Sequence, residues 1–127
     1  MSQIQSINSL LSGIINAQQS KLAEIKIKHS KLSIDILNVL YEEGYISDYK
    51  EDLYNGHKVI TVRLKYYNNS PAIKKIEKIS KNNISLKLLD LVDLGLVTYI
   101  LSTSKGIISG KEARRLRIGG TILLVVW

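Results

Sequence analysis

The sequence contains no cysteine, no phenylalanine, one proline and only two histidines among its 127 residues. Without cysteine the chain forms no disulfide, no thiolate metal site and no cysteine nucleophile. The two histidines, His29 and His57, have no carboxylate motif around them, and so few imidazoles exclude most zinc sites. We therefore expect neither a metal ion nor a cofactor, and the composition argues against an enzyme.

A long hydrophobic run is also missing. The longest apolar stretch, residues 121–127, is far shorter than the roughly 20 residues that cross a bilayer as a helix. The first basic residue is Lys21 and the N-terminal region has no arginine, so neither a secretory signal nor a mitochondrial presequence is recognisable. We expect no membrane association, and a protein that works in an organelle would be made there or already processed.

What the sequence does have is an ordinary hydrophobic content and an excess of positive charge. Hydrophobic residues make up 45% of the chain, and 18 Lys and Arg against 11 Asp and Glu give a net charge of +7. A compact basic chain binds an acidic partner, and nucleic acid is the first candidate. Lysine outnumbers arginine 14 to 4, and isoleucine, asparagine and tyrosine are plentiful, which indicates an AT-rich genome such as that of an organelle.

Hydrophobic periodicity predicts an αβαββ module over residues 1–67. Apolar residues recur at helical spacing over 4–18, and residues 24–29 alternate like a half-buried strand. Ser30 is placed to cap a second helix, which Gly44 ends. Asn55-Gly56 is a strong hairpin signal between two further strands. These strands are expected over 45–50 and 59–66, the second with Ile60, Val62 and Leu64 facing inward and Thr61, Arg63 and Lys65 facing outward.

Residues 68–127 are predicted to form a second module, mostly β with one short helix. The junction is expected at residues 68–71, where the only proline lies. Isoleucines at every third position over 73–79 favour a helix. Ser109 and Glu112 have the spacing of a capping box, which opens a short helix through Arg117. Strands are predicted for residues 86–94, with a turn, for 96–101 and for 121–127, a loop for 102–106, and a helix end at Gly119-Gly120. The fold class is therefore α/β (α+β), with two small packed modules.

The stretch Ser102-Thr103-Ser104-Lys105-Gly106 holds most of the candidate chemistry. Short hydroxyls pair with ribose hydroxyls and base edges, lysine meets phosphate, and glycine lets a ligand approach the backbone closely. An ordinary polar turn is the competing interpretation. Ser102 and Lys105 also match the S-x-x-K nucleophile motif of penicillin-recognising enzymes, but Gly106 follows directly and the companion SDN and KTG triplets are absent.

Basic residues gather in three places along the chain. Each cluster taken alone is usually a solvated face, but three clusters in a chain of net charge +7 favour a polyanionic partner. Tyr66-Tyr67 carries aromatic rings that either stack on bases or pack at the rim of the core. The clusters are Lys26, Lys28 and Lys31; Lys74, Lys75, Lys78, Lys81 and Lys87; and Lys105, Lys111, Arg114, Arg115 and Arg117.

The order of these motifs resembles the small-subunit ribosomal protein eight family. The strongest match runs from Leu101 to Arg114, whose Ser-Thr-Ser-Lys-Gly core is the hallmark of that family, and continues into Gly119-Gly120 and a closing apolar strand. The N-terminal half matches in order and spacing through Asn16-Ala17-Gln18, Ser30-Lys31-Leu32 and Glu42-Glu43-Gly44-Tyr45-Ile46. The resemblance covers nearly the whole chain.

The resemblance implies a structural constituent of the small ribosomal subunit, a primary rRNA binder of its central domain. The RNA would be held in the minor groove of an irregular helix, chiefly by the second module. Ser102, Thr103 and Ser104 would contact bases and ribose, Lys105 would contact phosphate, and Gly106 would allow close approach. The other candidate RNA-binding residues are Asn16, Ser30, Lys31, Lys111, Arg114 and Arg115.

The same resemblance suggests partners and a location. Neighbouring small-subunit proteins, ribosomal protein five above all, are expected partners, and no small-molecule substrate is expected. The ribosome is expected in a mitochondrion, with the gene in the organelle; a plastid or the bacterial cytoplasm are the alternatives. A free regulator that binds its own or another message is the alternative function.

Several positions depart from the family pattern. Gly13 and Ile15 stand where relatives usually have arginine on the first helix, and Lys87 stands where a tyrosine stacks on RNA. The loop over 88–95 is shorter than usual, and Thr121 replaces a common glutamate. These departures predict an RNA interface that is altered or weakened.

Overall fold

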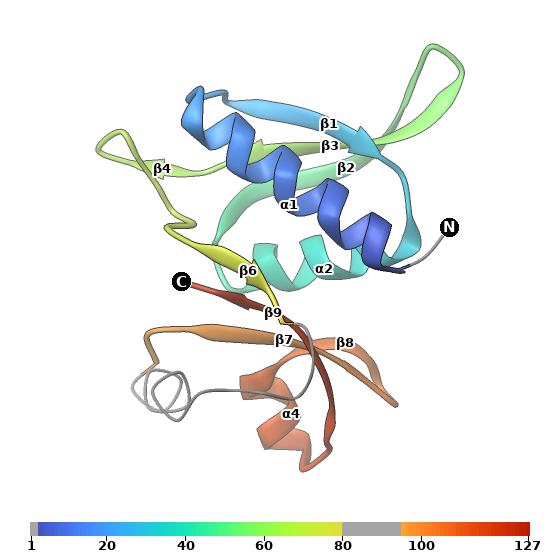
Figure 1. Cartoon of the computed structure of the whole chain (residues 1–127), viewed down its shortest axis with the longest axis vertical. Helices are drawn as coiled ribbons and strands as arrows, with labels where there is room; N and C mark the ends of the chain where they lie inside the picture. Colours follow the sequence, from blue (N-terminus) through green and yellow to red (C-terminus); the bar gives the residue numbers. More distant parts are fainter. Residues whose placement is uncertain (1–2, 80–94) are drawn as a thin grey trace. The chain divides into compact units, whose positions relative to one another are not determined.

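The computed structural model describes residues 3–79 and 95–127 of the chain. The chain divides into two compact units, Met1–Lys74 and Lys75–Trp127. Each unit combines helix with antiparallel strands in its own sheets (Figure 1), which is the predicted α+β class. Within the described residues, no helix is both long enough and apolar enough to span a membrane.

The first unit packs two helices with a three-stranded sheet, in the predicted αβαββ order. The helices are α1 (Gln3–Gln19) and α2 (Lys31–Glu42). The strands are β1 (Glu24–Lys28), β2 (Ile46–Tyr54) and β3 (His57–Leu64), antiparallel and in the order β1-β3-β2. A Cβ added to Gly13 would lie 3.3 Å from Ile27 Cγ2, so α1 packs closely against β1.

Local signals set the ends of α2 and of the β2–β3 hairpin where they were predicted. Ser30 is extended (φ −154°) and its Oγ accepts a hydrogen bond from the Ser33 N–H at 3.0 Å, which caps α2. Beyond the helix, Gly44 has φ +82°, a left-handed conformation that glycine adopts without a Cβ clash. Asn55 and Gly56 both have positive φ, as a two-residue turn that matches strand twist requires.

Thr61 departs from its expected exposed position. It lies on the face of β3 that points away from α1, as alternation predicts, but it is only 5% exposed. The register explains the burial: on the central strand Thr61 is directly flanked by Lys26 of β1 and Lys50 of β2, whose long stems lie beside its short side chain.

The stretch expected as a junction instead forms a hairpin of the first unit. Asn68 and Asn69 both have positive φ and join β4 (Tyr66–Tyr67) to β5 (Ser70–Pro71). The first unit therefore continues to Lys74 rather than ending at residue 67. Tyr66 donates its hydroxyl hydrogen to the Leu22 carbonyl at 2.7 Å, which ties this extension back to the residues that follow α1.

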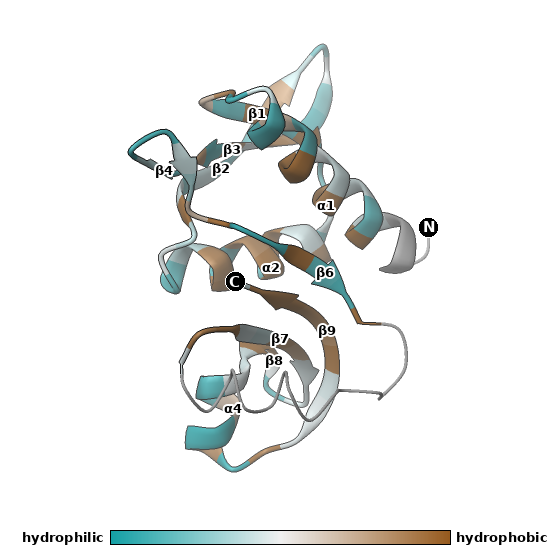
Figure 2. Cartoon of the chain, turned by 60° about the vertical axis from the view of Figure 1, so that its left-hand side comes forward, coloured by the Kyte–Doolittle hydropathy of each residue, from teal (hydrophilic) through white to brown (hydrophobic). Residues whose placement is uncertain are grey.

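Over its described residues, 75–79 and 95–127, the second unit is a four-stranded antiparallel sheet with one short helix. Its strands are β6 (Ile76–Lys78), β7 (Thr98–Thr103), β8 (Gly106–Ser109) and β9 (Gly120–Val126), in the order β6-β9-β7-β8. The helix α4 (Gly110–Leu116) packs on β7, where a Cβ added to Gly110 would lie 3.3 Å from Tyr99 Cβ. Figure 2 shows how strongly hydrophobic β9 is along its C-terminal half.

Three sequence predictions for this unit are wrong. The helix favoured over 73–79 is strand β6, because Lys75 and Trp127 exchange two backbone hydrogen bonds and long-range pairing overrides the spacing of the isoleucines. The loop expected over 102–106 is a tight hairpin, in which Thr103 pairs with Gly106. The short helix ends at Leu116 with Arg117 as its cap at φ +57°, which confirms the predicted bound at residue 117, but the Gly119-Gly120 pair lies beyond this cap and does not end the helix. The strand predicted over 86–94, Lys87 and the loop up to residue 94 lie outside the described residues.

Candidate nucleic-acid interface

The β7–β8 hairpin brings the five hallmark residues to one end of the second sheet. Ser102 and Thr103 close β7, Gly106 opens β8, and Ser104 and Lys105 form the two-residue turn between them. Ser104 and Lys105 are exposed, whereas Ser102 and Thr103 are half-buried. The turn therefore offers one hydroxyl and one ammonium group directly to a ligand.

Thr103 holds this turn in shape. Its Oγ1 donates to the Gly106 carbonyl at 2.8 Å and accepts from the Lys105 N–H at 3.1 Å. A hydroxyl has one proton, so towards a ligand Thr103 can only accept a hydrogen bond. The structure thus gives Thr103 a positioning role inside the hairpin, in addition to any contact it makes.

The three hydroxyls do not lie on one surface. Successive strand residues point to opposite faces, so Ser102 lies on the face of the sheet that carries Ile100, and Thr103 on the face covered by α4. Across the sheet, Ser102 is opposite Ile107 on one side and Thr121 on the other. A ligand that contacts all three hydroxyls has to wrap around the end of the hairpin.

Glycines on both neighbouring strands leave the backbone around Thr103 bare. The register pairs Thr103 with Gly106 of β8 and with Gly120 of β9. Gly106 has φ +102° and open space where a Cβ would be, so it serves the turn and leaves room for a ligand. Gly120 is required for packing, because a Cβ there would lie 2.3 Å from the Ser102 carbonyl oxygen and 2.7 Å from Thr103 Cγ2.

The basic residues of α4 project away from its buried side. Ala113 is buried against the sheet, whereas Lys111, Arg114 and Arg115 are exposed. Lys111 precedes Arg114 by three residues and Arg115 by four, so it neighbours both on the helix surface. The helix is capped by Ser109, whose Oγ accepts from the Glu112 N–H at 3.1 Å. This is the forward half of the predicted capping box.

Arg115 is paired within the helix. Its guanidinium donates to both carboxylate oxygens of Glu112, with Nε at 3.1 Å from each. The hydrogen bond from Arg115 lowers the pKa of Glu112 and raises the pKa of Arg115. A ligand phosphate that approaches Arg115 must therefore either displace the Glu112 carboxylate from the guanidinium or share the guanidinium with it.

In the first unit, Ser30 and Lys31 lie together at the start of α2 and Asn16 lies apart from them. Ser30 also donates to Ser33 Oγ at 2.9 Å, and Lys31, 89% exposed at its side chain, lies 3.6 Å from Asp35. Asn16 is exposed and lies towards the C-terminal end of α1, whereas Ser6 and Ser9 lie towards its N-terminal end. Along the helix axis Asn16 is about 10 Å from Ser9.

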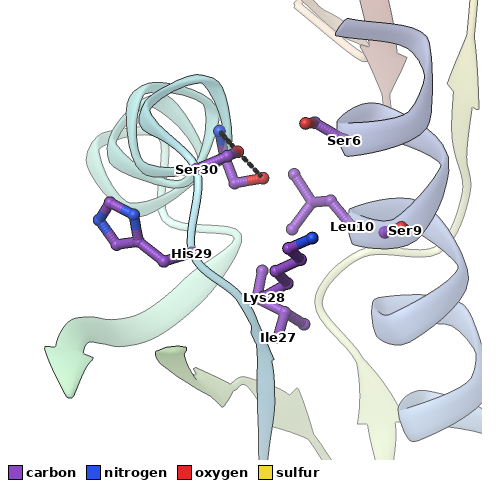
Figure 3. Close-up of a pocket in the computed structure, with 8 residues that line it drawn as sticks. Ser6, Ser9, Leu10, Ile27, Lys28, His29 and Ser30 are labelled. Atoms are coloured by element: carbon purple, nitrogen blue, oxygen red, sulfur yellow. Dashed lines mark hydrogen bonds between the residues drawn. The ribbon is translucent and has the colours of Figure 1, made fainter. Parts of the chain in front are cut away.

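A small cavity adjoins Ser30. It has a volume of about 20 Å³ and is lined by serines of α1 and α2 together with the end of β1 (Figure 3). In that view Ser6, Ser9, Lys28 and Ser30 surround the same space, and the Ser30 hydrogen bonds run to Ser33. A volume of this size holds about one water molecule and no larger ligand.

Comparison with known proteins decides the family. Residues 5–127 match the family model for ribosomal protein S8. Small ribosomal subunit protein uS8 of Acidithiobacillus ferrooxidans is 40% identical over 130 residues, covering 99% of both chains. The uS8 proteins of Nitrosomonas europaea, 41% identical over 94% of this chain and 95% of the relative, and of Erythrobacter litoralis, 37% identical over the full length of both, are similarly close.

The chain belongs to the ribosomal protein S8 family. It is therefore a structural constituent of the small ribosomal subunit, it binds rRNA, and it is not an enzyme. The relatives named above are bacterial. Within residues 3–79 and 95–127, no group of acidic or histidine side chains is arranged to hold a metal ion.

The structure also places the positions at which this S8 chain departs from the family pattern. Gly13 is turned towards Ile25 and Ile27 of β1, so a longer side chain there would start against the sheet. Ile15 is 37% exposed and apolar, and Thr121 is exposed beside Ser102. A reduced RNA contact by α1 stays a prediction.

One structural requirement of the S8 hairpin was missed from the sequence. Gly120 was assigned to a helix end, whereas it packs against the backbone of Ser102. The signal was present, because a glycine that opens an apolar strand often marks a close backbone approach. Its partner strand could not be identified without the register.

Proposed function

We propose that the β7–β8 hairpin is the principal rRNA contact of this chain. The observation that supports it is the exposed Ser104-Lys105 turn, which Thr103 braces, beside which Gly106 leaves open space and Gly120 lets β9 approach closely. A surface of exposed backbone and hydroxyl groups suits the shallow minor groove of RNA, because that groove displays 2′-hydroxyls and base edges with which such groups form hydrogen bonds.

The proposed roles follow from the contacts that each side chain can still make with a ligand. Ser104 donates to or accepts from a base edge or ribose, and Ser102 does so from the other face of β7. Lys105 contacts phosphate. Gly106 allows close approach, and Thr103 positions the turn and accepts one hydrogen bond.

Each unit contributes one further group of residues to the proposed RNA-binding surface. On α4, Lys111, Arg114 and Arg115 contribute positive charge to phosphate contacts. On the first unit, Ser30 and Lys31 at the start of α2 and Asn16 on α1 are proposed to contact RNA. The assignment of the main RNA contact to the C-terminal module, residues 68–127 in the sequence-based division, belongs to the same proposal.

Salt-dependent binding of an rRNA fragment tests the roles of Lys105 and Ser104. Lys105→Ala should weaken binding and flatten the slope of log K against log salt by about 1, because one phosphate contact is lost. Ser104→Ala should cost affinity, about 1–3 kcal/mol if a buried partner is left unpaired, with the slope unchanged. Lys50→Ala, an exposed lysine on β2, is the matched control. An unchanged slope for Lys105→Ala would contradict a phosphate contact.

The rRNA target is proposed to be the central domain of the small-subunit rRNA, with ribosomal protein five as a neighbour. The family resemblance supports both. Footprinting of the chain on full-length small-subunit rRNA should protect the central domain, and cross-linking in assembled subunits should recover ribosomal protein five. Protection confined to another domain would refute the first assignment.

A free RNA-binding regulator is the second candidate. The basic surfaces that serve rRNA would serve a message equally well, so charge does not separate the two. Sedimentation does: a ribosomal constituent co-migrates with small subunits at moderate salt, and a regulator remains in the light fractions.

We further propose that the ribosome in question is mitochondrial and that the gene is carried by the organelle. The excess of lysine over arginine and the abundance of isoleucine, asparagine and tyrosine support an AT-rich genome. A plastid or a bacterial cytoplasm are the alternatives. Mapping the gene to organellar or chromosomal DNA tests this directly, and a nuclear or bacterial chromosomal location would refute it.

A further inference from the structure

The β2–β3 hairpin of the first unit extends past the end of β1. The last β1 residue, Lys28, is opposite Val59, and two more cross-strand pairs follow before the turn. In Figure 1 this hairpin projects beyond the β1 arrow. Its outer residues Leu53 and Tyr54 are 69% and 55% exposed, so an aliphatic and an aromatic side chain are held out in solvent.

An open groove of about 840 Å³ lies where β1 stops alongside β3. Apart from Ile27 and Val59, its lining consists of cationic, imidazole and phenol side chains, and no carboxylate of the described residues lines it. These side chains belong to Lys26, Lys28, His29, Tyr54, His57 and Lys58. The groove is large enough for a segment of chain, unlike the one-water cavity beside Ser30.

The register places these groups around the end of β1. By register, the side chains of Lys28 and His57 start on the face away from α1, because Lys28 is opposite Val59 and His57 is two residues from Val59 on β3. Lys28, at the end of β1, also lines the small cavity beside Ser30. Tyr54 is opposite His57 and shares that face. Lys58 and His29 lie on the other side of the strands, where the His29 N–H donates to the Lys58 carbonyl at 3.4 Å.

Two carboxylates lie next to the groove. Glu51 is engaged with His29, whose Nε2 lies 2.5 Å from the Glu51 carboxylate. Asp52 is opposite Val59, on the same face as Lys28. The three lysines that line the groove outnumber these two neighbouring carboxylates, which leaves the groove positive.

We propose that this groove is a second RNA site, which binds a single-stranded segment. Lys26, Lys28 and Lys58 contact phosphates, and the Tyr54 ring stacks on an unpaired base. The combination of a positive groove with a solvent-held aromatic ring favours single-stranded nucleic acid over an acidic protein, because every base offers a face for stacking. The groove lies on the first unit and shares no residue with the proposed β7–β8 contact of the second unit. The proposal for the groove therefore does not depend on the proposal for that contact.

Two sites on one chain make the protein bivalent towards RNA. When the first segment is bound, the second binds as an intramolecular event at an effective concentration set by the chain, so a weak groove still adds to the overall affinity. The proposed consequence is that the chain joins a helical and a single-stranded segment of RNA.

Fluorescence anisotropy of the full-length chain with a labelled dodecauridylate tests the groove. The triple variant Lys26→Gln/Lys28→Gln/Lys58→Gln should bind at least tenfold more weakly and flatten the salt slope by about 2, as expected for three phosphate contacts on a single strand. The control Lys21→Gln/Lys50→Gln/Lys74→Gln removes the same charge from exposed positions outside the groove and should stay within twofold of the unmodified chain. Unchanged far-ultraviolet circular dichroism shows that each variant is folded.

Tyr54 variants separate stacking from charge. Tyr54→Ala should weaken dodecauridylate binding at least fivefold, and Tyr54→Phe should restore it to within twofold. The fold loss caused by the groove triple should be the same with Lys105 present and in a Lys105→Ala background, so failure of the groove and failure of the β7–β8 contact are distinguishable. Equal losses in the groove and control triples would overturn the proposal. So would a Tyr54→Ala variant without effect together with equally tight binding of polyglutamate, which would assign the groove to an acidic protein.

Discussion

Gly120 lies so close to the hairpin that a single methyl group there would displace it. The added Cβ would meet the Ser102 carbonyl oxygen at 2.3 Å, which is backbone and cannot rotate away. We expect Gly120→Ala to destabilise the chain by about 1–3 kcal/mol through overpacking and to weaken rRNA binding. Gly119→Ala is the matched control: that position has open space, so its stability should change by less than about 0.5 kcal/mol. Urea unfolding of both variants checks this, and equal effects would contradict it.

The Glu112–Arg115 pair predicts a local pH response. Since the hydrogen bond from Arg115 lowers the folded-state pKa of Glu112, the pair stabilises α4 above the ordinary glutamate pKa, and this is lost as the pH falls through the lowered value. An NMR titration of Glu112 should therefore show a midpoint below that of an ordinary glutamate. Arg115→Gln should move the midpoint back up. A midpoint that does not respond to the substitution would show that the pair is not formed.

Among the elements, α2 offers a test that separates stability from RNA contact. Ser30→Ala removes the cap and should cost about 1 kcal/mol, measured by thermal unfolding. Ser30→Asp keeps a capping oxygen and places a negative charge at the helix N-terminus, so stability should be retained. The same carboxylate would repel a phosphate, so rRNA affinity should fall if Ser30 lies at the RNA. Unchanged affinity in Ser30→Asp would remove Ser30 from the interface.

Elements with a local chemical signal were predictable, and those formed by distant pairing were not. Asn55-Gly56 and Ser30 specify a turn and a cap through their own side chains and backbone freedom, and both are confirmed. Strand β6 is three residues long and exists because Val126 lies beside Ile76, fifty positions away. In the same way, the hallmark residues were found as a motif, but their division between the two faces of β7 depends on a hairpin register that no local signal encodes.

At the scale of the whole molecule, the two units can be followed separately. The only tryptophan, Trp127, lies in the second unit, against the cluster of Val97, Tyr99 and Val125. Among the described residues, most of the helix lies in α1 and α2, with 17 and 12 residues, and both belong to the first unit. Tryptophan fluorescence reports on the second unit.

Binding of rRNA should raise the stability of the second unit. At a free fragment concentration of a hundred times Kd, linkage predicts about 2.7 kcal/mol of added stability for a unit that binds only when folded. We expect the urea midpoint reported by Trp127 to rise with an rRNA fragment. The rise should be smaller for Lys105→Ala at the same fragment concentration. No shift in the unmodified chain would contradict the placement of the main contact in this unit.

The backbone pairing of Lys75 with Trp127 has a consequence for the order of folding. The β7–β8 hairpin closes over a handful of residues, whereas β6 can pair only after a segment about fifty residues later in the chain has arrived. Local contacts form fast because little chain entropy is lost, and distant ones form late. A chain that is still being synthesised would thus form the Ser104-Lys105 turn before β6 pairs and completes the sheet of its unit. RNA that is already present could then bind this turn before the rest of the protein has folded.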